Sequence, residues 1–123
     1  MKILLLDDDV FLRDMYAIKF TERGDKPTPV STGMEALSLL EEETFDVVVT
    51  DMVMPQMSGL DLLRKIKEKH PKLPCIVLSN QGESFDKDDA EKAGAVGYIV
   101  KAEYVPSEVV EKVHTILQGI AVS

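Results

Sequence analysis

Short, uninterrupted apolar runs alternate along this sequence with segments that have helical spacing. Four runs are rich in Val, Ile and Leu, and because they lack a polar–apolar alternation, each predicts a strand buried on both faces. These runs are residues 2–6, 46–50, 74–79 and 97–101. A weaker candidate at residues 28–31 is short and close to prolines, which indicates an edge strand.

The intervening segments place apolar residues on one helical face. They cover residues 10–23, 34–43, 60–69, 85–93 and 107–117. Gly24, Gly94 and Gly119 follow three of these segments, at positions typical of a helix C-terminus. Strict strand–helix alternation predicts an α/β fold, a doubly wound (βα)5 sandwich with a five-stranded parallel sheet of order 2-1-3-4-5.

Length and charge restrict the class of protein. The chain has 123 residues, which suits one domain over 1–123, and its formal charge of -8 disfavours direct binding to nucleic acid or anionic lipid. The first apolar run ends at Asp7 and is too short for a signal peptide or membrane span, so we expect a cytoplasmic protein. Cys75 is the single cysteine, which excludes an internal disulfide and favours a buried core residue.

Carboxylates follow two of the predicted strands. Asp7 and Asp8 come after the first strand and Asp51 after the third, and the carboxyl ends of parallel strands share one edge of a sheet. At an effective dielectric near 20, each pair of charges about 5 Å apart costs roughly 3 kcal/mol, so a cation is required. Hard oxygen ligands favour Mg²⁺, or Mn²⁺, over zinc. Asp9 we assign instead to capping the first helix.

Two more polar side chains end strands at the same edge. Ser79 ends the fourth predicted strand and Lys101 ends the fifth. A hydroxyl donor and a flexible ammonium suit a phosphoryl group bound beside a metal. Together with the carboxylates they complete a phosphate-binding constellation of nucleophile, metal, hydroxyl and cation.

With these residues assembled, the sequence resembles the receiver domains of response regulators in two-component signal transduction, over essentially its whole length. The resemblance rests on five separated blocks: Ile3-Leu4-Leu5-Leu6-Asp7-Asp8, Val48-Val49-Thr50-Asp51-Met52-Val53-Met54-Pro55 with Gly59 after it, Leu78-Ser79, Gly94-Ala95, and Gly97-Tyr98-Ile99-Val100-Lys101. The family fold is flavodoxin-like, in agreement with the strand order predicted above.

The resemblance implies a role for each acidic residue of the site. Asp51 would be the phosphoacceptor, and Asp8 and Asp51 would bind the metal directly. Asp7 would act mainly through a metal-bound water, and the main-chain carbonyl of Val53 would be a further ligand.

The same resemblance implies the groups that hold and sense the phosphoryl group. Lys101 would pair with it, Ser79 would be the switch hydroxyl, and Tyr98 the switch aromatic. Main-chain N–H groups of Met52 and Asn80 would bind phosphoryl oxygens.

The implied partners are proteins. The phosphoryl donor would be a phosphohistidine on a sensor histidine kinase or phosphotransfer protein, and the domain would hydrolyse its acylphosphate slowly rather than act as an enzyme with a substrate of its own. The output would be a downstream protein, or a self-dimer, bound at the face formed by the fourth helix, fifth strand and fifth helix. His70 and His114 have no place in the pocket and are predicted to be surface residues.

Two departures from the family pattern leave alternatives open. Ala102 stands where the family usually has proline, so we expect a trans Lys101–Ala102 bond. No effector domain follows the fifth helix, so the chain either works alone or is part of something longer. A degenerate receiver used as a scaffold is one rival. A haloacid-type phosphatase is another, although its nucleophile follows the first strand, with a second Asp two residues later.

Overall fold

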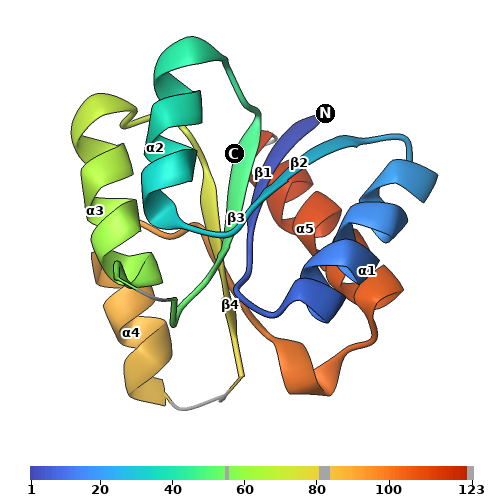
Figure 1. The fold of residues 1–123 in the computed structure, drawn as a ribbon. Coiled ribbons are helices and arrows are strands. Elements are labelled where there is room, and N and C mark those ends of the chain that lie inside the picture. Colours follow the sequence, from blue (N-terminus) through green and yellow to red (C-terminus); the bar gives the residue numbers. More distant parts are fainter. Residues whose placement is uncertain (55, 81–83, 122–123) are drawn as a thin grey trace.

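The computed structural model has five parallel strands in one sheet, in the order β2-β1-β3-β4-β5 (Figure 1). The structure describes residues 1–54, 56–80 and 84–121, and Pro55 of the motif lies outside them. The strands are β1 (Lys2–Leu6), β2 (Lys26–Val30), β3 (Val47–Asp51), β4 (Cys75–Ser79) and β5 (Gly97–Val100). The predicted fold class and strand order are confirmed.

Helices cover both faces of this sheet. They are α1 (Val10–Glu22), α2 (Gly33–Glu42), α3 (Gly59–Lys69), α4 (Ser84–Lys92) and α5 (Pro106–Ala121). Figure 1 shows α1 and α5 on one face and α2, α3 and α4 on the other. The continuous apolar strands predicted from the sequence follow from this arrangement, because a strand covered on both sides has no solvent face.

Successive side chains of β1 enter two separate cores. Leu4 and Leu6 pack with the side chains of α2 and α3, whereas Ile3 and Leu5 pack with those of α1 and α5. All four are 0% exposed, and complete burial of such a side chain stabilises the fold by about 1.5–3 kcal/mol. These two cores fix β1 in the middle of the sandwich, and the residues that follow it therefore have a defined position.

The edge strand β2 accommodates two prolines. It pairs with β1 alone, and Lys26 donates its N–H to the Met1 carbonyl oxygen at 2.9 Å. Since ladder bonds alternate along a strand, Pro27 and Pro29 fall where no N–H is needed. The strand was predicted at the edge and begins slightly earlier than expected.

Helix starts and ends follow local sequence signals. The Asp9 side chain accepts the Leu12 N–H at 3.1 Å, which confirms the predicted N-cap of α1. Gly24 and Gly94 have φ angles of 100° and 103°, a left-handed conformation that suits glycine after α1 and α4.

The predicted end of the last helix is wrong. α5 continues through Gly119 to Ala121. A glycine inside a helix costs only about 1 kcal/mol relative to Ala, so it does not by itself stop a helix whose hydrogen bonds continue. Within the described part of the chain, no helix is both long enough and apolar enough to cross a membrane.

Candidate functional site

Three carboxylates meet at the carboxyl edge of the sheet. Asp7 and Asp8 follow β1, Asp51 ends β3, and the two strands are neighbours. Each residue offers one oxygen, and these oxygens lie within 4.8 Å of one another. Asp7 and Asp51 are 0% and 3% exposed, whereas Asp8 is open to solvent. The convergence expected from strand order is therefore present.

Lys101 supplies the positive charge inside this cluster. Its Nζ lies 3.1 Å from Asp7 Oδ2 and 3.2 Å from Asp51 Oδ2. Burial lowers the pKa of Lys101, but Asp7 and Asp51 raise it further, so the net pKa lies above the usual value and the ammonium stays charged.

The charge of the cluster suits a divalent cation. Three carboxylates and one ammonium leave two negative charges, and the exposed side of Asp8 leaves room for water in a coordination shell. Oxygen ligands with an incomplete protein cage fit Mg²⁺, which keeps several waters when it binds to proteins. The residues present therefore fit the metal that the sequence suggests.

The carboxylate of Asp51 is held from both sides. Oδ1 accepts the Met52 N–H at 2.8 Å, and Oδ2 accepts Lys101 Nζ at 3.2 Å. Burial raises the pKa of Asp51 to about 6, with Lys101 opposing the shift and Asp7 adding to it. Asp51 is therefore largely ionised at pH 7, but it is less acidic than an ordinary Asp.

The loop after β3 packs directly behind Asp51. The Gly59 N–H donates to the Met52 carbonyl oxygen at 2.9 Å, and a Cβ at Gly59 would overlap the Asp51 carbonyl oxygen. Only glycine allows this approach, which explains the Gly that follows the Asp51 motif. The Val53 side chain is 74% exposed, so its packing does not constrain the main-chain carbonyl expected to bind metal.

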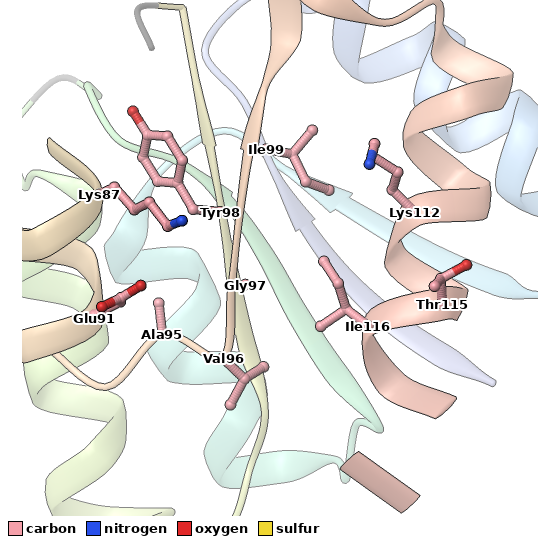
Figure 2. Close-up of a pocket in the computed structure, with 10 residues that line it drawn as sticks. All are labelled: Lys87, Glu91, Ala95, Val96, Gly97, Tyr98, Ile99, Lys112, Thr115 and Ile116. Atoms are coloured by element: carbon pink, nitrogen blue, oxygen red, sulfur yellow. The ribbon is translucent and has the colours of Figure 1, made fainter. Parts of the chain in front are cut away.

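The predicted hydroxyl and the predicted switch residue lie on neighbouring strands. Ser79 ends β4, is 4% exposed and is in register with Val100, which precedes Lys101. Asn80 follows it and is exposed. Tyr98 lies on β5 and its ring is on the side of α4, beside Lys87 (Figure 2).

The segment after β5 forms a short helical turn. Lys101–Glu103 form a 3₁₀ helix, closed by the Tyr104 N–H to the Lys101 carbonyl at 3.3 Å. The Lys101–Ala102 peptide bond is trans, as predicted. Lys101 reaches both carboxylates from this conformation.

Sequence reasoning missed Arg13. It lies on the first turn of α1, and its Nη1 donates to the Asp7 carbonyl oxygen at 3.2 Å. The only signal in the sequence is its place one helical turn after the acidic run.

The histidines lie away from these carboxylates, but one prediction about them is wrong. His114 is not a simple surface residue, because its side chain is 15% exposed and its Nε2 lies 2.6 Å from Asp25 Oδ2. Asp25 is itself buried, and its other oxygen, Oδ1, pairs with the Met1 amino group at 3.1 Å, so His114 and Met1 together satisfy this buried carboxylate.

A separate cavity of about 620 Å³ opens over α4, β5 and α5, the face predicted to bind partners (Figure 2). Its floor is β5 from Gly97 to Ile99, with Lys87 on α4 and Lys112 on α5. No side chain is present at Gly97, and a Cβ there would collide with Ile116. The cavity lies at the edge strand β5, and none of the carboxylates of the acidic site lines it.

Known proteins resemble this chain over nearly its full length. A family model described as response regulator receiver domain matches residues 3–114. The two-component response regulator PhoP of Pseudomonas aeruginosa is 35% identical over 82% of this chain and 45% of its own length. The chemotaxis protein CheY of Thermotoga maritima is 34% identical over 94% of this chain and 96% of its own length.

Solved structures of receiver domains have the same fold as this chain. The receiver domain of the Francisella response regulator 1452 has a TM-score of 0.86 and 29% identity, and the match covers 97% of this chain and 98% of that one. The chain spans about half the length of several curated relatives, PhoP among them, and nearly all of CheY. With its fold, its acidic site and these matches in agreement, the chain belongs to the response regulator receiver domain family of two-component systems.

Proposed function

We propose that this chain is a single receiver domain over residues 1–123 that accepts a phosphoryl group on Asp51. The donor is a phosphohistidine on a sensor histidine kinase or a phosphotransfer protein. The observation that carries the proposal is the Asp51 carboxylate, buried beside Lys101 at 3.2 Å and within 4.8 Å of the Asp7 and Asp8 carboxylates. Burying an acid beside one cation and two further acids costs stability, and clusters with this kind of cost are typical of functional sites.

The metal of the proposed site is Mg²⁺, with Mn²⁺ able to replace it. Its ligands are Asp8, Asp51, the Val53 carbonyl and, through water, Asp7. When bound, the cation supplies positive charge to the phosphoryl oxygens in transfer. The balance of three carboxylates against one ammonium supports this assignment.

The residues of the chain perform the rest of the reaction. An Asp51 oxygen attacks phosphorus in line, a P–O bond forms, and the P–N bond breaks with its electron pair left on the donor imidazole. No general base is required, because Asp51 with a pKa of about 6 is largely ionised at pH 7. Lys101 turns from the carboxylates to the new phosphoryl oxygens, and the N–H groups of Met52 and Asn80 bind them.

The acylphosphate stays on Asp51, so the domain acts as a switch. Water hydrolyses the acylphosphate slowly, and small phosphodonors replace the kinase in vitro, so we do not class the protein as an enzyme with turnover of a separate substrate. We infer that it works in the cytoplasm and does not itself bind nucleic acid, which the formal charge of -8 supports.

The output is a change at the face of α4, β5 and α5. The Ser79 hydroxyl moves toward the phosphoryl group, and the Tyr98 ring fills the space that this movement leaves. The cavity over β5 carries charged groups on Lys87, Glu91 and Lys112, and its shape and these charges can be recognised by a downstream protein or a second copy (Figure 2).

The proposal is tested with acetyl phosphate and Mg²⁺. Wild-type protein should gain one acid-labile phosphate, as measured by intact-mass spectrometry, and the same protein with EDTA should gain none. Asp51→Asn should fold, shown by circular dichroism, and remain unlabelled. A folded wild-type protein that takes no phosphate from acetyl phosphate or from a panel of histidine kinases would instead be a degenerate receiver acting as a scaffold. Rapid turnover of a phosphomonoester would indicate a phosphatase.

A further inference from the structure

Arg13 binds the main chain of the acidic loop. Its Nη1 donates to the Asp7 carbonyl oxygen at 3.2 Å, and the side chain is half-buried on the first turn of α1. The guanidinium thus makes its hydrogen bond to a neutral carbonyl, although the Asp7, Asp8 and Asp51 carboxylates converge at the same edge of the sheet. A contact to a carbonyl fixes the backbone, whereas a contact to a carboxylate would neutralise a metal ligand.

The carbonyl oxygen in question controls the direction of Asp8. It belongs to the planar peptide group that joins Asp7 to Asp8, so holding the oxygen holds the whole plane. Asp7 has its own side-chain anchors, because Oδ2 contacts Lys101 at 3.1 Å and Oδ1 accepts the Asp9 N–H at 2.9 Å. Asp8 is exposed and has little packing around it, so the position of its main chain limits where its carboxylate can reach.

The same helical turn holds the other end of the loop. The Arg13 N–H donates to the Asp9 carbonyl oxygen at 2.9 Å, and the Asp9 side chain accepts the Leu12 N–H at 3.1 Å. The first turn of α1 therefore holds the residues on both sides of Asp8. An oxygen of the Asp8 side chain lies within 4.8 Å of oxygens of Asp7 and Asp51.

We propose that Arg13 is a positioning residue, which holds the Asp7–Asp8 peptide plane so that the Asp8 carboxylate points into the metal site. This inference rests on the proposed function, in which Asp8 binds Mg²⁺. The sign of the change in Mg²⁺ affinity on removing Arg13 tests this inference, because two effects of Arg13 on that affinity oppose each other. Its positive charge repels a dication and its hydrogen bond orients a ligand for that dication.

The experiment measures Mg²⁺ affinity of the full chain without phosphodonor, by calorimetric titration. We expect Arg13→Ala to raise the Kd roughly tenfold, the ratio that corresponds to loss of one hydrogen bond to a charged group. Arg13→Lys keeps a charged donor and should recover part of the affinity. Lys19→Ala is the matched control, since it removes one positive charge from the same helix at a residue paired with Glu22, away from the loop.

Thermal unfolding in EDTA, measured on the same proteins, shows whether a loss of affinity merely reflects a loss of fold. If Arg13→Ala does not fold, Arg13→Lys is compared with wild type in the same titration and should bind Mg²⁺ more weakly. Arg13→Ala that binds Mg²⁺ as tightly as wild type, or more tightly, would overturn the inference and leave the proposed function standing. Wild-type protein that does not bind Mg²⁺ would overturn both.

Discussion

Lys101 Nζ lies 3.2 Å from Asp51 Oδ2, and this ion pair joins the residue after β5 to the last residue of β3. Both side chains are almost completely buried, with 4% and 5% of their surface exposed. The pair compensates only part of the cost of burial, because the pKa of Asp51 still rises to about 6. The site therefore holds a charge that the fold would be more stable without.

That balance predicts how stability depends on pH. The pKa of Asp51 rises from 3.8 to about 6 on folding, so its favourable contribution is complete below pH 3.8 and is lost as the pH rises through 6. Metal-free Asp51→Asn should gain stability over wild type between pH 4 and 7, by up to about 3 kcal/mol. Urea unfolding in EDTA at several pH values measures the difference. A difference that does not change with pH would contradict this explanation.

The other partner of the pair predicts the opposite effect. Lys101→Met leaves two buried carboxylates, Asp7 and Asp51, without their cation. We expect a loss of about 3–5 kcal/mol in the metal-free protein at pH 7, because breaking a buried pair leaves uncompensated charge. Lys65→Met, at an exposed site on α3, should change stability by less than about 0.5 kcal/mol. Equal effects of the two substitutions in chemical denaturation would show that Lys101 is not needed to stabilise the cluster.

Neighbouring residues of the acidic loop should separate metal binding from helix stability. Asp8→Ala should weaken Mg²⁺ binding strongly and leave α1 unaffected. Asp9→Ala should bind Mg²⁺ nearly as well as wild type but lose about 1 kcal/mol of stability, because the Asp9 side chain caps α1. Titration and urea unfolding of both variants test this crossed pattern. Equal losses of Mg²⁺ affinity would mean that Asp8 is not the direct ligand.

The switch should depend on Ser79 but phosphorylation should not. Ser79→Ala should still accept phosphate on Asp51, yet transmit little change to the face of α4, β5 and α5. With beryllofluoride bound to the wild-type domain, amide shifts should spread from Ser79 through Tyr98 to Glu108, and they should shrink in the variant. Shifts confined to another face of the wild-type domain would exclude this route.

Much of the site follows from strand order alone. Asp7, Asp51 and Lys101 are far apart in the sequence, but each follows or ends a parallel strand, so topology brings them to one edge. The N-cap at Asp9 and the trans bond before Ala102 were predictable from local chemistry, since capping and proline effects act over a few residues.

Contacts set by tertiary packing were not predictable. The bond from His114 to Asp25 joins residues 89 positions apart, and no local pattern encodes it. The sharing of Lys101 between two carboxylates, the pKa of about 6 for Asp51 and the bond from Arg13 to the Asp7 carbonyl also depend on burial and side-chain direction. The continuation of α5 past Gly119 has the same origin, because tertiary context outweighs the modest helix penalty of one glycine.

The most direct test of the central claim identifies the residue that carries the phosphoryl group. Wild-type protein is treated with acetyl phosphate and Mg²⁺, the acylphosphate is reduced with borohydride, and the peptides are sequenced by mass spectrometry. We predict that reduction converts Asp51, and no other acidic residue, to homoserine. Reduction at a different Asp or Glu, or a stable phosphate on Ser79, His70 or His114, would contradict the assignment of Asp51 as the phosphoacceptor.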